Sequence, residues 1–413
     1  MAREGGVMGT VTDYVQTETQ DFSVVPFNEV DALVYAMLAY CPIPDEIPTL
    51  DELEERYGTL AKRLKQFDWK HPLASTHAIA QVPYNGVKIR DMAQFHPVAD
   101  GEEAPTTEPS FVPGKVTEAF YRTLAGNPRF SSSELNAAQV RFRTDQATQF
   151  AAITYKLPDG TLVIGYRGTD DTLVGWREDF DMSYAYPVPA QRMAADYLRR
   201  VAQLWDGPIM LTGHSKGGNL AVYAAMNVEE RIQDRIQRIF SMDGPGFPSG
   251  VASSKEYAAI VDRITKVMPD SSIIGLLMTM PQREHHIIVK SNVDGIMQHS
   301  GFNWLTKGDQ FDTVPELSPK SQQFYADMNH WLDTNPPERI ERGVAALFRV
   351  LEASGHERPS QIATSGLGQI PDMLSEFVGL DSDQRKVIMQ VMGMIMGAAL
   401  SHNPDVNRSA GAE

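Results

Sequence analysis

Short apolar runs alternate with helical segments between residues 150 and 290, and this alternation most limits how the chain can fold. Predicted helices at 189–205 and 217–231 separate several of the apolar runs. Near-continuous apolar strands that alternate with helices form mostly parallel sheets covered on both faces. The sequence therefore predicts an α/β fold. The predicted strands are 150–155, 161–166, 208–212, 239–242, 263–268 and 285–289.

The segments on either side of this region predict further layers rather than separate folds. One N-terminal helix is expected to begin after the capping residue Asn28, and a second to run over 49–67. Beyond residue 318 the pattern is helical to the end. We expect four regions: N-terminal helices packed on the core (22–65), a cap or lid-like region (66–135), the catalytic core (136–317) and a C-terminal helical extension (318–405).

The charge balance excludes some kinds of partner. The chain has 37 Lys and Arg residues against 53 Asp and Glu, a formal net charge of −16. Such a field disfavours nucleic acid and anionic membranes. The longest near-apolar run, 387–400, is too short to span a bilayer and predicts a buried helix, so no stable membrane insertion is expected.

The single cysteine and the polar N-terminus bear on the compartment. Cys41 has no partner for an internal disulfide, and no cysteine-based metal site can form. The N-terminal residues lack the apolar segment of a secretory signal. Together these features favour a cytoplasmic location.

The strand at 209–212 leads directly into Gly213-His-Ser215-Lys-Gly217 and then into a helix. This is the G-x-S-x-G pattern at a strand-to-helix turn. The serine must stand on a strained turn, so the residues two before and two after it must lack side chains. The backbone N–H of Lys216 then points toward a developing oxyanion. The alternative is an ordinary glycine-rich turn capped by Ser215.

A nucleophilic serine needs a base, and the base needs an acid that orients it. His299 lies on the loop after the strand 285–289 and is the best-placed base. Asp270 follows the strand 263–268 and is our first choice for the acid, although it might only cap the next helix. Asp243, which follows the strand 239–242, is the second choice.

The second oxyanion donor is expected on the loop that follows the strand 161–166. Gly168 permits a tight turn there, and the backbone N–H of Thr169 can face the serine. Arg167 and Asp170 are expected to brace this loop as a buried ion pair. The segment 176–180 is a second candidate brace.

Together these motifs resemble the class 3 (fungal-type) lipases. The fuller match, roughly residues 22–350, resembles a bacterial family of lipase-like α/β-hydrolases of unknown function. The motifs that carry the resemblance are Tyr-Arg-Gly-Thr at 166–169, Gly-His-Ser-Lys-Gly at 213–217, Met-Pro-Asp-Ser-Ser-Ile-Ile at 268–274 and Gln-His-Ser-Gly-Phe-Asn-Trp at 298–304.

The resemblance implies an α/β-hydrolase fold with Ser215 as nucleophile, Asp270 as acid and His299 as base. It also implies Thr169 and Lys216 as oxyanion donors. Lys216 replaces the leucine usual in those lipases, and a cation beside the site is expected to favour an anionic or polar acyl group. The region 66–135 has no clear counterpart in them.

The predicted activity is cleavage of a small or lipid-like carboxylic ester without a metal or organic cofactor. Acyl transfer, thioester or amide cleavage at the same triad is an alternative, and so is a catalytically silent binding protein. The C-terminal helices have three open roles: packing on the body, a homodimer contact, or lining an acyl pocket.

Overall fold

A computed structural model describes residues 8–80, 82, 84, 86–94, 114–143, 148–169, 172–357 and 370–399. Within them, nine strands form one mixed sheet in the order β12-β9-β8-β7-β6-β5-β4-β3-β2. The strands from β5 to β9 are parallel, and the two edges are antiparallel. The strands are β2 (Val87–Lys88), β3 (Glu134–Arg143), β4 (Thr148–Lys156), β5 (Leu162–Tyr166), β6 (Ile209–His214), β7 (Ile236–Met242), β8 (Ile264–Pro269), β9 (His285–Val289) and β12 (Thr313–Val314).

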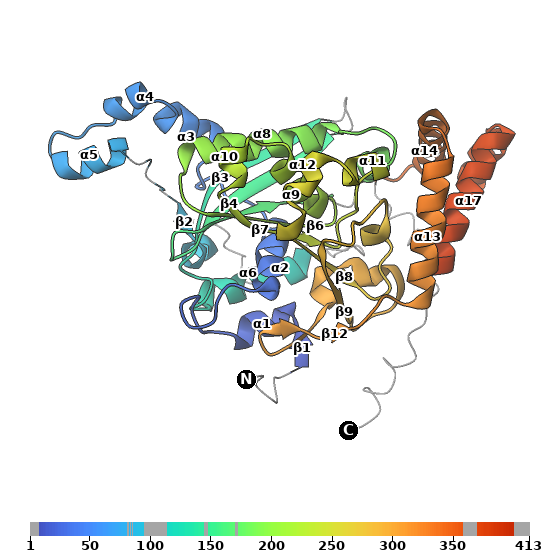
Figure 1. Ribbon diagram of the computed structural model, residues 1–413, viewed down its shortest axis with the longest axis horizontal. Helices are drawn as coiled ribbons and strands as arrows, with labels where there is room; N and C mark the ends of the chain where they lie inside the picture. The colour runs from blue at the N-terminus through green and yellow to red at the C-terminus, as the bar shows by residue number, and fades with distance from the viewer. Residues whose placement is uncertain are drawn as a thin grey trace.

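Helices cover both faces of this sheet (Figure 1). The α-helices are α1 (Val11–Thr17), α2 (Glu29–Leu38), α3 (Leu50–Tyr57), α4 (Leu60–Lys65), α5 (Pro72–Ala80), α6 (Gly114–Gly126), α7 (Leu173–Asp181), α8 (Pro189–Leu204), α9 (Lys216–Met226), α10 (Glu230–Gln233), α11 (Ser249–Ala252), α12 (Lys255–Ala258), α13 (Pro319–Thr334), α14 (Pro337–Glu352), α16 (Ile370–Gly379) and α17 (Ser382–Ala399). Short 3₁₀ turns are η1 (Ile89–Gln94), η3 (Val261–Arg263), η4 (Ile274–Leu276), η5 (Gly295–His299) and η6 (Gly301–Asn303). A small second sheet joins β1 (Met8–Thr10), β10 (Leu305–Lys307) and β11 (Gln310–Phe311).

Alternation along the parallel strands divides the apolar core into two layers. On β7, Phe240 packs in the layer that includes α1, α2 and α6, and the neighbouring Ile239 packs in the layer that includes α8 and α9. On β5, Val163 and Ile164 divide in the same way. Successive side chains of a strand point to opposite faces, so strands that are apolar on both faces need helices on both sides. The predicted α/β architecture is confirmed at this level.

The structure departs from the sequence analysis in three places. The helix expected over 49–67 is two helices, because Gly58 ends α3 and Thr59 caps α4. The strand β3 was not predicted. Within the region expected to form a cap, β2 pairs with β3 and α6 packs in the body, whereas α5 projects from it (Figure 1). Residues 95–113 of that region lie outside the described residues.

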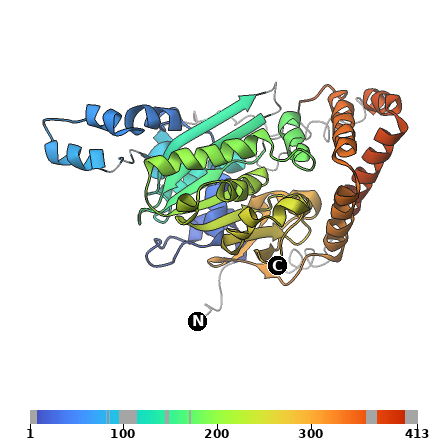
Figure 2. The same cartoon turned by 45° about the horizontal axis from the view of Figure 1, so that its top comes forward.

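The two ends of the molecule carry different helical extensions. Figure 2 shows α13, α14 and α17 standing at one end of the sheet and the pair α4–α5 projecting at the opposite end. Residues 387–399 of the apolar run form most of α17, which buries Val387, Ile388 and Ala398 but exposes Met389 and Met396. The prediction of a buried helix is therefore correct for one face only.

None of the helices among the described residues combines the length and the apolar character needed to cross a membrane.

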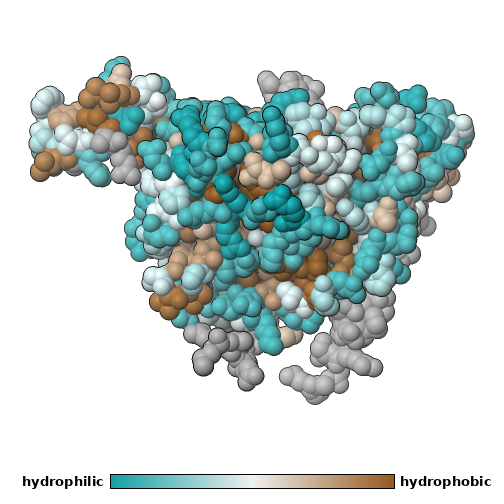
Figure 3. Space-filling view, viewed as in Figure 1, coloured by the Kyte–Doolittle hydropathy of each residue, from teal (hydrophilic) through white to brown (hydrophobic). Residues whose placement is uncertain are grey.

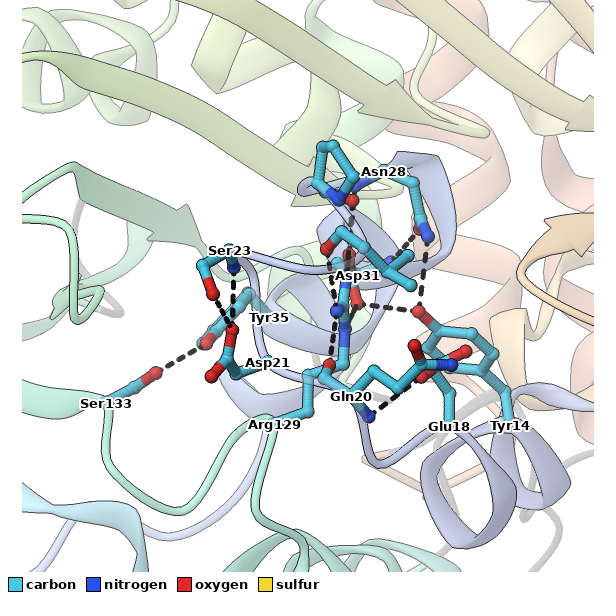
Figure 4. Close-up of polar contacts among 12 residues, drawn as sticks. Tyr14, Glu18, Gln20, Asp21, Ser23, Asn28, Asp31, Tyr35, Arg129 and Ser133 are labelled. Atoms are coloured by element: carbon cyan, nitrogen blue, oxygen red, sulfur yellow. Dashed lines mark hydrogen bonds and ion pairs between the residues drawn. The ribbon is translucent and has the colours of Figure 1, made fainter.

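A fully buried ion pair ties the N-terminal segment to the body (Figure 4). Asp31, in the first turn of α2, accepts hydrogen bonds from Arg129 Nε at 2.8 Å and Nη2 at 2.5 Å. The Tyr14 hydroxyl also donates to Asp31, at 2.8 Å, and Arg129 Nη1 donates to the carbonyl oxygens of Gln20 and Val25. Both charges are thus hydrogen-bonded, as burial without loss of stability requires.

Removing one partner of this pair should therefore be costly. We expect Arg129→Met to lower the free energy of unfolding by about 3–5 kcal/mol, because it leaves Asp31 buried and unpaired. Arg141→Met is the matched control: Arg141 pairs with Asp51 at 2.6 Å, but both side chains are about half exposed, so the loss should stay below about 1 kcal/mol. Urea denaturation measures both. Equal small losses would show that the buried pair does not stabilise the fold.

Candidate active site

The turn between β6 and α9 places Ser215 in a backbone conformation that side chains rarely adopt. Ser215 has a φ of 58° and a ψ of −133°. Its backbone N–H donates to the carbonyl of Met242 at 2.8 Å, which ties the turn to the end of the neighbouring strand β7. Such strain persists only where the surroundings impose it, and it is most common at functional sites.

Close backbone contacts explain the two glycines of the turn. A Cβ atom on Gly213 would overlap the carbonyl oxygen of Gly217, and a Cβ atom on Gly217 would overlap the carbonyl oxygen of Tyr166. The loop after β5 approaches just as closely, because a Cβ atom on Gly168 would meet the Ser215 Cβ atom at 3.1 Å. Any side chain at these three positions would push the turn and the loop apart.

His214, directly before the serine, acts as a clamp: it holds the loop that carries His299, the histidine loop, against the serine turn. Its Nε2 lies 2.6 Å from the backbone carbonyl of His299, and the two imidazole rings are 4.7 Å apart between centroids. A carbonyl can only accept, so Nε2 carries the proton and Nδ1, 3.2 Å from the Tyr40 hydroxyl, can accept. Burial lowers the pKa of His214 to about 3, with a smaller effect from His299, so the clamp is a neutral imidazole.

His299 is paired with Asp243. The histidine ends η5, and its Nδ1 lies 2.6 Å from Asp243 Oδ2. Both side chains are almost fully buried. The second carboxylate oxygen of Asp243 accepts from the Ser272 hydroxyl at 2.5 Å. Since a carboxylate only accepts, the Nδ1 atom of His299 carries a proton and Nε2 is left as the basic nitrogen.

Asp270, the first-ranked acid, occupies a different position. It follows β8, and its side chain is hydrogen-bonded to Ser271 and Gln298. Burial raises the pKa of Asp270. It therefore contacts Gln298, the residue before the site histidine, whereas the Nδ1 atom of His299 is hydrogen-bonded to Asp243. The structure corrects the ranking in favour of Asp243, because β7 is the strand adjacent to β6 and its end lies closer to the turn.

The loop after β5 is braced by α7. The Thr169 hydroxyl donates to the carboxylate of Asp179, with both oxygens at 2.7 Å. Burial raises the pKa of Asp179 to about 6, against the opposing effects of the Lys216 charge and the Thr169 hydrogen bond. This contact lies in the segment 176–180, the second predicted brace.

The ammonium group of Lys216 is paired inside the protein. Its Nζ atom donates to Glu178 Oε2 at 2.9 Å and lies 3.7 Å from Asp179 Oδ1, and its side chain is fully buried. Glu178 also accepts from the backbone N–H groups of Gln149 and Ala190, each at 3.1 Å. The premise behind the expected preference for an anionic or polar acyl group, a cation available beside the site, is therefore wrong, because the charge of Lys216 is already paired with Glu178 inside the protein.

Two further predicted features can be located only in part. Asp170 lies outside the described residues, so its ion pair with Arg167 stays a prediction. Arg167 is half-buried, and its backbone N–H donates to the carbonyl oxygen of Ala151 at 3.0 Å.

Across the described ranges, no group of three or more His, Cys, Asp or Glu side chains is arranged to hold a metal ion.

An apolar cavity of about 90 Å³ lies beside the site. Trp176 and Phe180 of α7 form one wall, and Ile273 after β8 forms another. The opposite side comes from the C-terminal helices, including Val344 of α14 and Val391 of α17. The C-terminal extension therefore closes a space that the sheet and its loops leave open.

Three contacts place this cavity next to the catalytic candidates. Asp179, which lines it, holds the hydroxyl of Thr169. Ile273 lines it and directly follows Ser272, the hydroxyl donor to the site aspartate. Ile296 lines it from η5, the turn that ends at the site histidine. The cavity thus adjoins the residues that hold the loop after β5, the segment after β8 and the turn η5.

Sequence reasoning missed His214, Tyr40 and Ser272. His214 occupies the variable second position of G-x-S-x-G, so the motif gave it no role. Tyr40 follows a helix more than 170 residues earlier in the chain, and only the fold brings it there. The one available signal for the acid was the Asp243-Gly244 pair after a strand, where Asp243 takes a positive φ of 48°.

The fold and the site define an α/β protein in which a serine on a strained strand-to-helix turn adjoins a buried histidine–aspartate pair. The model of the Mbeg1-like family matches residues 124–349, just over half of the chain. The chain belongs to this family. None of the curated proteins matches the sequence.

Two solved lipase structures share weak similarity with the chain. The Rhizomucor miehei lipase in its propeptide complex is 14% identical with a TM-score of 0.30, over 47% of this chain and 65% of the lipase. The M37 lipase is 16% identical with a TM-score of 0.29, over 60% of this chain and 70% of that one. The matched part of the first is thus slightly under two thirds of its length. These values assign no activity to the chain.

The two acids can be distinguished without any assay of activity. We expect a strongly downfield Nδ1 proton resonance from His299 in the proton NMR spectrum, because Asp243 fixes that tautomer. Asp243→Asn should abolish the resonance, whereas the matched change Asp270→Asn should keep it. His299→Gln identifies the signal. Loss of the resonance in Asp270→Asn with retention in Asp243→Asn would reverse the assignment.

Proposed function

We propose that this protein is a serine hydrolase with an α/β-hydrolase fold that cleaves carboxylic esters through an acyl-enzyme on Ser215. The observation that carries the proposal is the 2.6 Å hydrogen bond between His299 Nδ1 and Asp243 Oδ2, held against the strained serine turn by His214. The nucleophile Ser215, the acid Asp243 and the base His299 each follow a strand of the sheet. Their order along the chain, serine then aspartate then histidine, is the order typical of α/β-hydrolases.

In the proposed reaction, His299 Nε2 takes the Ser215 hydroxyl proton as Oγ attacks the ester carbonyl carbon. Asp243 stabilises the imidazolium that forms and remains ionised. When the tetrahedral intermediate collapses, the imidazolium donates its proton to the leaving alcohol, and the acyl group stays on Ser215. Water, deprotonated by the same histidine, then releases the acid.

The oxyanion is stabilised, in this proposal, by the backbone N–H groups of Lys216 and Thr169. Lys216 opens α9, where N–H groups and the helix dipole favour negative charge. Thr169 is positioned by its hydrogen bond to Asp179, so the brace between α7 and the loop supports this role. One such donor is typically worth about 3 kcal/mol of barrier.

The apolar cavity favours an aliphatic acyl group over a charged one. Its walls are almost entirely apolar side chains, and the nearest cation, Lys216, is already paired with Glu178. An uncharged chain entering it would lose contact with water at no cost in unpaired polar groups. The proposed substrate is therefore an ester with a short to medium aliphatic acyl chain.

Labelling with a fluorophosphonate tests whether Ser215 is an activated nucleophile. We expect stoichiometric labelling of the wild-type protein and none of Ser215→Ala, because only an activated serine reacts with this probe. Ser253→Ala, which removes an exposed serine, is the matched control and should label like wild type. Folded wild-type protein that stays unlabelled and does not hydrolyse p-nitrophenyl esters would favour a silent binding protein.

Acyl-chain selectivity tests the cavity. We expect kcat/KM for p-nitrophenyl esters to rise by roughly fourfold per added methylene until the cavity is full, as each buried methylene contributes about 0.8 kcal/mol. Val391→Phe, which fills the cavity, should lower kcat/KM for the longer esters about tenfold and leave the acetate unchanged.

The neighbouring position on the same helix provides the control for that experiment. Met392 is outside the cavity lining and exposed, so Met392→Phe should retain the wild-type selectivity. The same chain-length profile in both variants would place the acyl group elsewhere.

A further inference from the structure

We propose that the arm formed by residues 59–80, which contains α4 and α5, docks on the surface of a phospholipid bilayer that carries anionic lipids. This inference is independent of the hydrolase assignment, because it concerns the end of the molecule opposite the C-terminal helices (Figures 1 and 2).

The arm presents large apolar side chains to solvent. Trp69 is 85% exposed and Leu73 87%, whereas Leu60 and Leu64 on α4 are each more than half exposed. No residue of α4 is buried. Figure 3 shows hydrophobic residues at more than one place on this projection, among hydrophilic ones. Soluble monomers seldom expose several large apolar residues on one small element unless the surface binds something.

The arm is anchored at its base and ordered at its tip. Arg200 bonds Glu54 of α3 at 2.6 Å, which fixes the base on the body. At the tip, the backbone N–H of Asp68 donates to the Ser75 hydroxyl at 2.8 Å. The Asp68 carboxylate in turn accepts from the Lys70 backbone N–H at 2.8 Å. These contacts hold Trp69 outward on a defined turn.

The charge of the arm is opposite to that of the whole chain. Residues 60–73 carry Lys62, Arg63, Lys65 and Lys70 against one carboxylate, Asp68, although the net charge of the protein is −16. Charges are screened over about 8–10 Å at physiological salt. Because the arm projects from the acidic body, a surface that meets it first experiences the local positive charge.

This combination of residues fits a lipid surface rather than a second protein. Tryptophan is enriched at the membrane–water interface, and leucine beside lysine and arginine is typical of segments that lie in the headgroup region of anionic membranes. The other exposed apolar face, on α16 and α17, lacks this charge pattern: residues 370–399 hold four carboxylates against Arg385 and Lys386. Of these two described faces, the arm is the one that combines exposed apolar side chains with a positive charge.

Flotation of the full chain with liposomes tests the proposal. Wild-type protein should float with vesicles of phosphatidylglycerol and phosphatidylcholine in equal parts, but not with phosphatidylcholine alone, and the binding should weaken in high salt. Lys65→Glu/Lys70→Glu should lower the partition coefficient by roughly 20- to 30-fold or more, since each basic residue near an anionic surface contributes about fivefold. Trp69→Ser/Leu73→Ser should lower it at least about tenfold.

The matched control replaces two exposed apolar side chains at the opposite end of the molecule, on α17. Met389→Ser/Met396→Ser on α17 should float like wild type, and all variants should keep the wild-type unfolding midpoint because every altered side chain is exposed. Wild-type protein that does not float, arm variants that float normally, or loss of flotation only in the α17 variant would each overturn the proposal. So would a wild-type dimer, detected by sedimentation velocity, that the arm substitutions dissociate.

Discussion

The packing at the Ser215 turn is the constraint on which the site depends. Three glycines, at 168, 213 and 217, bring the loop after β5, the end of β6 and the start of α9 into backbone contact, and the serine takes a positive φ as a result. That contact leaves His214 facing the histidine loop, where it holds the His299 carbonyl at 2.6 Å. The pairing of His299 with Asp243 then follows from where this clamp places the imidazole.

Local patterns were enough to predict the strained serine turn and to single out His299. Apolar strands and the spacing of glycines involve neighbouring residues, so both can be recognised in the sequence. The partner of His299 was ranked wrongly, since Asp243 and Asp270 both follow strands and the sequence does not show that β7 is the strand next to β6. Lys216 was misread because the partner of its side chain, Glu178, comes from a helix 38 residues earlier. The α/β core was predictable, but the strand β3 and the break at Gly58 were not.

The two ends of the molecule have different physical character. At one end, α14 and α17 close an apolar cavity beside the site, so a segment without catalytic residues shapes the space next to them. At the other, α4 and α5 expose apolar and basic side chains on a projection. In our proposals the first end selects the acyl group and the second positions the protein at a lipid surface. A bulk charge of −16 and a basic arm are compatible because screening separates them.

A crystal structure of the protein after reaction with an alkyl fluorophosphonate tests the central proposal most directly. The account predicts phosphorus bonded to Ser215 Oγ, a phosphoryl oxygen facing the Lys216 and Thr169 N–H groups, and the alkyl chain in the cavity beside α7. His299 should remain paired with Asp243. An adduct on another residue, or His299 hydrogen-bonded to Asp270 in the adduct, would contradict it.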